Sequence, residues 1–251
     1  MKSKLLGIVL ASLLLGSIVF ALPVSAGSEQ DPEITDPQGD ATIGGVDIVR
    51  GWVAEESQTS FSIHLMIADL ENAGPFGASG NENAPCFRAW FVFEPTNIMY
   101  VAEASKSMTF GEQYKLYCVE FENTGAPKTM HSLANLSGEW NTSEKQVVLT
   151  VEKRMINVSK IEGGAPAYDN TKTPKVGDRI TSPSGEGIVW GWTGGPPSVL
   201  GKDSTSPGKA YTFSVAPTAP ETGKFPILMV GLIAIILIAA IGGVIALWIK
   251  K

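Results

Sequence analysis

Three aspartates near the start of the chain are the first residues whose type and spacing suggest chemistry. Asp36 and Asp40 lie in the segment Asp-Pro-Gln-Gly-Asp, and Asp47 follows shortly after them. Carboxylate oxygens are preferred ligands of Ca²⁺, although the D-x-D-x-D-G spacing of a dedicated calcium loop is missing. Because Asp-Pro-x-Gly-Asp is also ordinary turn chemistry, a plain turn is the alternative. Asp36, Asp40 and Asp47 are therefore candidate ligands of a structural calcium ion.

Two tryptophans separated by one glycine form a second candidate site. Trp190 and Trp192 share one face if this segment is a strand, because side chains alternate between the two faces of a sheet. Exposed, the two indoles would form a stacking platform for a sugar or another planar ligand. Packing in the core is the competing interpretation, since tryptophan is highly buried on average. We take Trp190 and Trp192 as the candidate ligand-binding residues.

The chain has two cysteines, Cys86 and Cys118, and two histidines, His64 and His131. In an oxidising compartment such a cysteine pair usually forms a disulfide, which we predict here, with two buried thiols as the alternative. In a simple meander their strands would be first and third, roughly 9–10 Å apart, so the bridge requires a different strand order or a loop position for Cys86. The sequence lacks the C-x-x-C and H-x-x-x-H spacings that would indicate a zinc site.

Short apolar runs separated by glycine and proline predict an all-β, antiparallel β-sandwich of about nine strands. Residues 60–68 alternate apolar and polar side chains, and residues 87–93 place Phe87, Ala89, Phe91 and Phe93 on one face. The other predicted strands are residues 46–53, 98–104, 114–121, 129–136, 146–151, 178–181, 187–192 and 210–215. Residues 72–85 and 157–177 are predicted to be loops.

The two ends of the chain predict export and membrane anchoring. Residues 1–26 have a basic start, an apolar stretch and a small-x-small cleavage site, as signal peptides do, with an uncleaved signal anchor as the alternative. Residues 225–249 carry no charge and are long enough to span a bilayer as one helix, and the lysines at 250–251 predict a cytoplasmic end. Between them we expect an acidic lead-in at 27–45, an extracellular β-sandwich at 46–215 and a Pro/Thr-rich tether at 216–224.

The segment from Ala219 to Gly223 resembles the sorting signal of sortase substrates, with alanine where leucine is usual. This resemblance implies cleavage between Thr222 and Gly223 and loss of the membrane span. A plain tether is the favoured interpretation, because Lys224 and the tail of only two lysines depart from the signal.

Three N-x-S/T sequons begin at Asn135, Asn141 and Asn157. They are candidate glycosylation sites if the host glycosylates exported proteins, and their clustering predicts a solvent-facing edge.

Asp36-Pro-x-Gly-Asp40, followed by Asp47-Ile48 at the head of a strand, resembles the opening of exported DOMON-like and family-9 carbohydrate-binding-module-like domains. Ala68-Asp69-Leu70 and Gly177-Asp178 agree with this resemblance, which covers roughly residues 36–215. It implies a β-sandwich that binds sugar, binds haem, or has no assigned role. For haem, His64 and Met66 cannot clamp one iron from opposite sides, whereas His131 with a methionine from another strand can supply the ligand types.

The net charge of −6 and the absence of a basic stripe argue against nucleic acid as a partner. No nucleophile elbow or metalloprotease motif is present, so we expect binding and no catalysis.

The sequence therefore predicts a single-pass cell-surface β-sandwich that acts as an extracellular ligand- or carbohydrate-binding module. A structural or adhesive surface protein is the main alternative, and a haem electron carrier is a weaker one; no cofactor is predicted except a possible structural calcium ion. The expected partners are membrane lipid through residues 225–249 and a surface glycan or protein.

Overall fold

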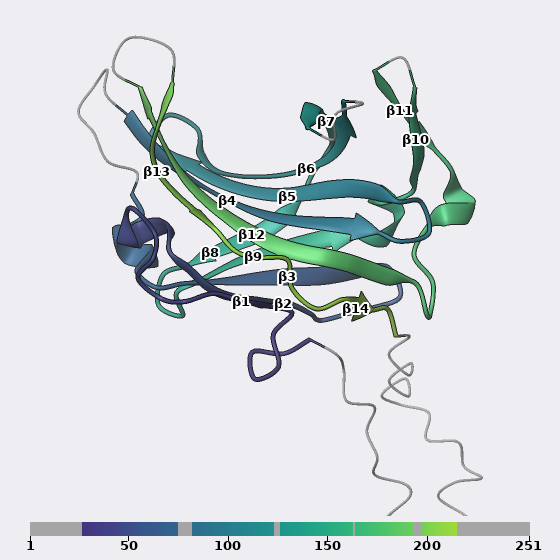
Figure 1. The fold of residues 1–251 in the computed structure, drawn as a ribbon, viewed down its shortest axis with the longest axis horizontal. Helices are drawn as coiled ribbons and strands as arrows, with labels where there is room; N and C mark the ends of the chain where they lie inside the picture. Colours follow the sequence, from purple (N-terminus) through teal and green to yellow (C-terminus); the bar gives the residue numbers. More distant parts are fainter. Residues whose placement is uncertain (1–26, 75–81, 123–125, 163, 193–196, 215–251) are drawn as a thin grey trace, which may run out of the picture. The chain divides into compact units, whose positions relative to one another are not determined.

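Two antiparallel sheets stacked face to face form the body of the protein (Figure 1). The computed structural model describes residues 27–74, 82–122, 126–162, 164–192 and 197–214, which belong to one compact unit ending at Ser214. Within them there are fourteen strands, no α-helix and four short 3-10 segments. No helix of this described part is long and apolar enough to cross a bilayer. The predicted signal segment, tether and membrane span lie outside the described residues.

The smaller sheet has the strand order β1-β2-β3-β9-β8. The bounds of its strands are β1 Ile34–Thr35, β2 Ile48–Ala54, β3 Ser60–Ile67, β8 Ser137–Asn141 and β9 Gln146–Glu152. The 3-10 segments η1 (Gly44–Val46), η2 (Leu70–Asn72) and η3 (Lys153–Met155) adjoin these strands in the chain.

The larger sheet has the order β13-β12-β4-β5-β6-β7, and β14 also pairs with β12. Its strands are β4 Glu82–Phe93, β5 Ile98–Ser107, β6 Gly111–Phe121, β7 Pro127–Asn135, β12 Arg179–Trp192, β13 Ser198–Ser204 and β14 Tyr211–Thr212. A separate hairpin pairs β10 (Val158–Glu162) with β11 (Ala165–Tyr168), ahead of the 3-10 segment η4 (Asn170–Lys172).

The core lies between the two sheets and follows the alternation of the sequence. Phe61 and Leu65 on β3 and Phe87 and Phe91 on β4 are fully or almost fully buried in one hydrophobic cluster. The prediction that Phe87, Ala89, Phe91 and Phe93 share the inner face is thereby confirmed. The all-β class and the antiparallel pairing are confirmed as well.

Strand β12 departs most from the expected pattern, because it unites two predicted strands across a segment that contains Pro183. The pairing of β12 with β4 shifts register between Thr181 and Ser184, and Ser182 has a φ of 50°. A β-bulge accommodates a proline that a regular central strand would exclude. The segments predicted as loops also contain strands: β10 and β11 lie within residues 157–177, and β4 begins at Glu82.

Candidate functional site

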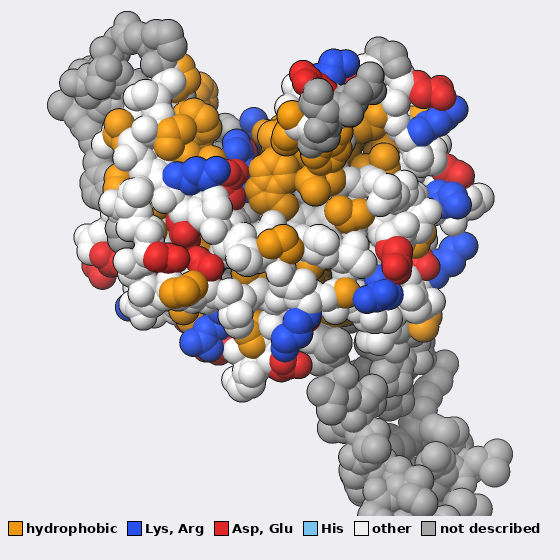
Figure 2. All heavy atoms as spheres, viewed as in Figure 1, with side chains coloured by type: hydrophobic (Ala, Val, Ile, Leu, Met, Phe, Trp, Pro, Cys, Tyr) orange, Lys and Arg blue, Asp and Glu red, His pale blue; other side chains and the backbone are white. Residues whose placement is uncertain are grey.

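The face of the larger sheet that is turned away from the smaller sheet is concave and open (Figure 1). Figure 2 shows a hollow between two raised ends of this unit, lined by hydrophobic side chains with charged ones beside them. A cleft of about 240 Å³ lies on this face. We call it the sheet cleft; it is lined by Ala84, Cys86, Arg88, Glu103, Ser105, Ser107, Phe110, Gly111, Gln113, Lys115 and Trp190.

A row of charges of alternating sign crosses four strands at the sheet cleft. Arg88 pairs in register with Glu186 of β12 on one side and with Glu103 of β5 on the other. Its Nε donates to Glu103 Oε2 at 2.8 Å and its Nη1 donates to Glu186 Oε2 at 3.2 Å. Lys202 of β13 extends the row through an ion pair of 2.8 Å with Glu186 Oε1. We call Lys202, Glu186, Arg88 and Glu103 the charge row.

Three of the four side chains of the charge row are largely withdrawn from water although they lie on an outer sheet face. Arg88, Glu103 and Glu186 retain only 12–17% of their side-chain exposure. Withdrawing ionised groups from water is costly unless they are paired and hydrogen-bonded, and here each one is. The charge row is thus held in one geometry. The Arg88 guanidinium also has further N–H groups besides the two that donate to these carboxylates.

Cys86 lies in the sheet cleft beside Arg88 and does not form the predicted disulfide. Both cysteines are free thiols, and both are buried. They lie on β4 and β6 with β5 between them, and Cys118 faces the core, whereas Cys86 lines the cleft. Two inter-strand spacings, roughly 9–10 Å, exceed the reach of a disulfide. Burial, reinforced by Glu103, raises the pKa of the Cys86 thiol well above its ordinary value, which makes it a poor nucleophile at neutral pH.

Trp190 lines the sheet cleft and is half-buried, which places one of the two predicted tryptophans at a candidate ligand site. The backbone of Trp192 pairs with Glu82 at the end of β12, and its side chain is not among those that the structure describes. The cleft contains a second aromatic side chain, Phe110, which is 73% exposed in the turn between β5 and β6. Phe110 was not predicted as a site residue, because an isolated phenylalanine in a turn carries no spacing signal.

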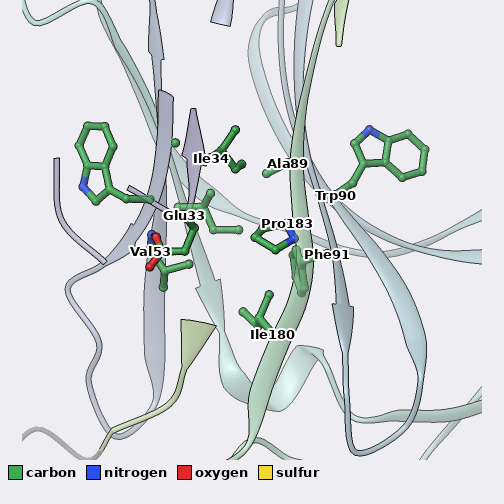
Figure 3. A pocket seen from close by; sticks show the side chains of 11 residues that line it. Glu33, Ile34, Val53, Ala89, Trp90, Phe91, Ile180 and Pro183 are labelled. Atoms are coloured by element: carbon green, nitrogen blue, oxygen red, sulfur yellow. The ribbon is translucent and has the colours of Figure 1, made fainter. Parts of the chain in front are cut away.

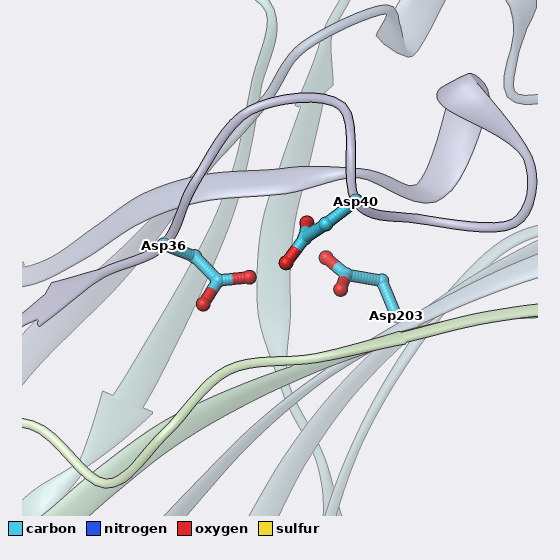
Figure 4. Close-up of side chains that lie close together, drawn as sticks. All are labelled: Asp36, Asp40 and Asp203. Atoms are coloured by element: carbon cyan, nitrogen blue, oxygen red, sulfur yellow. The ribbon is translucent and has the colours of Figure 1, made fainter.

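Of the three predicted metal ligands, the fold brings Asp36 and Asp40 together with Asp203, which the sequence did not indicate. Each offers one carboxylate oxygen, and these oxygens all lie within 4.8 Å of one another (Figure 4). Asp47 borders this group without being part of it. Its Oδ2 accepts the N–H of Gly39 at 2.7 Å, in the loop that carries Asp36 and Asp40. We call Asp36, Asp40, Asp47 and Asp203 the aspartate cluster.

The aspartate cluster gives a pH prediction for protein free of divalent cations. Burial, together with the charges of Asp203, Asp40 and Asp47, raises the pKa of Asp36 to about 6, whereas an unfolded chain has about 3.9. Between these values the folded state binds the proton and the unfolded state does not, so this group stabilises the fold as the pH falls from 7 to 5. We expect the Asp36→Asn variant to lack this increase in stability between pH 7 and pH 5.

The measurement is urea unfolding of the wild type and of Asp36→Asn at pH 7 and pH 5. Other carboxylates contribute as well, since hydrogen bonds lower the pKa of Glu120 and Asp169, whereas burial raises the pKa of Glu33 and Asp203. The difference between the two proteins is therefore the readout. If that difference is the same at both pH values, the raised pKa of Asp36 is contradicted.

The three sequons occupy unlike positions. Asn135 is exposed at the end of β7, and Asn141 is half-exposed at the end of β8. Asn157 is only 3% exposed, and its Nδ2 donates to Asn170 Oδ1 at 2.8 Å. The expectation that all three mark a solvent-facing edge is therefore wrong for Asn157, because its position before β10 turns the amide into the protein.

Both histidines have hydrogen-bonding partners within the protein. His64 stacks on Trp52, and its two ring nitrogens contact Ser62 and Gln146. His131 Nε2 lies 3.2 Å from Glu120 Oε2. A haem ligand role for His131 would require it to give up this carboxylate contact or to coordinate through Nδ1.

The cavity described between the two sheets is too small for an organic ligand. A cavity of about 10 Å³ lies there, enough for one water molecule at most. Figure 3 shows Ile34, Ala89, Pro183 and Ile180 turned toward it and the indole of Trp90 turned away. Two wider clefts, of about 440 and 330 Å³, lie outside the smaller sheet around Ser137 and Thr150. Neither has an aromatic side chain other than His64 in its lining, unlike the sheet cleft.

Comparisons with protein-family models, with curated protein sequences and with solved structures find no match to this chain. The structure shows an antiparallel β-sandwich-like fold, which is compatible with the DOMON-like resemblance and does not by itself establish it. A fold of this class hosts many functions, so the function has to be argued from the site.

Proposed function

We propose that this protein is a cell-surface binding module and that the sheet cleft binds a carbohydrate. The observation that carries this proposal is the combination of the charge row with two aromatic side chains, Trp190 and Phe110, on an open sheet face. Arrays of fixed polar groups beside an exposed aromatic ring suit a ligand with hydroxyls on its edge and C–H groups on its face. A sugar ring has both.

The polar side of the cleft supports a neutral, hydroxyl-rich ligand over a strongly charged one. The cleft is lined by Arg88 and Lys115 together with Glu103. Arg88 is already paired with Glu103 and, beside the cleft, with Glu186, so a phosphate or another polyanion would meet carboxylates as well as cations. Ser105, Ser107 and Gln113 line the same cleft and add neutral donors and acceptors. The volume of about 240 Å³ lies below the roughly 300–1,000 Å³ of typical small-molecule sites. It therefore suits one ring of a longer glycan.

A glycan array probed with the purified full-length protein tests this function. We expect selective binding to neutral glycans, and we expect Trp190→Ala to lower the affinity by about tenfold or more, through loss of ring stacking. The matched control is Tyr168→Ala, which removes an aromatic ring that is 58% exposed on β11, away from the sheet cleft. This control is expected to bind as the wild type does.

Thermal unfolding of each variant confirms that the fold is retained. No binding by the wild type to any glycan, or equal binding by the wild type and Trp190→Ala, overturns the assignment. The protein would then be better described as a structural or adhesive surface protein.

Export and membrane anchoring complete this proposal and rest on residues 1–26 and 225–249 of the sequence. Mass spectrometry of the mature protein from membranes tests them. We expect an N-terminus near Gly27 and a C-terminus at Lys251, whereas a C-terminus at Thr222 would show sortase-type processing.

A further inference from the structure

We propose that Asp36, Asp40 and Asp203, with Asp47 beside them, form a calcium site that fastens the loop after β1 to the edge strand β13. This site is separate from the sheet cleft and does not depend on the proposed carbohydrate binding. Its ligands come from two distant parts of the chain: Asp36 and Asp40 lie in the loop after β1, and Asp203 lies on β13.

The carboxylates converge from different directions (Figure 4). The side chains of Asp36, Asp40 and Asp203 point toward one another, and their nearest oxygens lie within 4.8 Å. Oxygens that bind one Ca²⁺ at about 2.3–2.6 Å can be at most about 5.2 Å apart. The spacing therefore fits a shared ion without rearrangement of the backbone.

Asp47 provides an independent indication that a cation belongs here. This residue is only 2% exposed, and its Oδ1 is buried without a hydrogen-bond partner among the described residues. Its other oxygen is held by the N–H of Gly39, between Asp36 and Asp40, and its charge acts on both Asp36 and Asp203. A buried carboxylate oxygen with no donor is costly. A cation in the cluster would offset the cost of this charge and would give a partner to the buried Asp36 Oδ2, which also has none among the described residues.

No basic side chain of the described residues forms an ion pair with the aspartate cluster. Among the ion pairs of the described residues, none involves Asp36, Asp40, Asp47 or Asp203. Lys202, the neighbour of Asp203, points instead to Glu186.

The donor set selects among cations. All candidate ligands are carboxylates, and no histidine or cysteine belongs to the group, which disfavours zinc and copper. A loop and a strand edge provide flexible, oxygen-rich coordination of the kind that Ca²⁺ accepts, whereas Mg²⁺ demands near-ideal octahedral geometry. Asp203 Oδ2 also accepts the N–H of Ile48 at 2.7 Å, so the ion would join β13, the loop and the start of β2.

Calorimetric titration of the metal-free full-length protein with CaCl2 tests the site. We expect one saturable site with a Kd of about 10⁻³ M or tighter, the range of extracellular calcium modules, and a higher unfolding temperature in CaCl2 than in EDTA. Asp203→Asn and Asp40→Asn should each weaken Ca²⁺ binding by at least about tenfold. Asp40 is exposed and its side chain forms no hydrogen bond with another described residue, so Asp40→Asn keeps the test valid if Asp203→Asn fails to fold.

The matched control is Glu144→Gln, which removes one exposed carboxylate in the turn between β8 and β9 and should leave Ca²⁺ binding unchanged. Absence of calcium binding by the wild type, or wild-type affinity in folded Asp40→Asn, overturns the site. Equal affinity for Mg²⁺ overturns its assignment to calcium. A glycan array in EDTA and in CaCl2 is scored separately, so failure of carbohydrate binding leaves this result standing.

Discussion

Replacing Glu56 with alanine is expected to destabilise the fold by about 3–5 kcal/mol, the cost of breaking a buried ion pair by removing one partner. Glu56 Oε1 accepts from Lys153 Nζ at 2.6 Å, and the two side chains are only 5–6% exposed. Its Oε2 accepts from the hydroxyl of Tyr211 at 2.8 Å and from the N–H of Ser214 at 2.7 Å. The substitution therefore leaves Lys153 buried and unpaired and removes the carboxylate contacts of Tyr211 and Ser214.

Urea unfolding followed by tryptophan fluorescence measures this effect. The matched control is Arg154→Ala, which breaks the neighbouring pair with Glu152; those side chains are 76% and 44% exposed. Exposed pairs contribute about 0–1 kcal/mol, so this control should change stability little. Equal losses in the two variants would show that Glu56 is no more important than a surface carboxylate.

Replacing Phe91 with alanine is expected to cost about 3–5 kcal/mol, the usual range for removing a buried aromatic ring. Phe91 is 2% exposed near the end of β4. Its ring stacks on Tyr100 at a centroid distance of 5.6 Å and meets the edge of Phe61 at 6.3 Å. It therefore joins the inner faces of both sheets, and its loss leaves a cavity that β-strands cannot easily collapse to fill.

Phe110→Ala makes the same chemical change at a position that is 73% exposed. It should alter the free energy of unfolding by no more than about 0.5 kcal/mol. The same urea titration compares the two variants. If both lose similar stability, packing between the sheets is not what holds β4 in place.

The sequence predicted the inner faces of the strands better than their ends. Phe61, Ile63, Leu65 and Ile67 alternate in the chain, and all four are buried on β3. By contrast, the proline and glycines of residues 179–192 predicted a break, whereas β12 continues through a bulge. The alternation of apolar and polar side chains within a segment shows which face of the strand meets the core. Whether a bulge forms depends on the strand with which that segment pairs, and the sequence of the segment does not contain this information.

Among the candidate site residues, the sequence identified those with a local signal. The Trp190-Gly-Trp192 spacing indicated the strand that borders the sheet cleft, and the Asp-Pro-x-Gly-Asp segment indicated two members of the aspartate cluster. Arg88, Glu103 and Glu186 were not predicted, because each is an isolated charge in its own strand. They become a row only when β5, β4 and β12 pair in register.

The sequence by itself determined that the described part of this protein is built of strands with one apolar face, because side-chain alternation has the period of the strand itself. The tertiary structure decided which residues from distant strands meet. Asp203 joins Asp36 and Asp40, and Cys86 and Cys118 are kept apart, through the order and register of strands in the sheets. That order minimises the free energy of the whole chain, and no single segment encodes it.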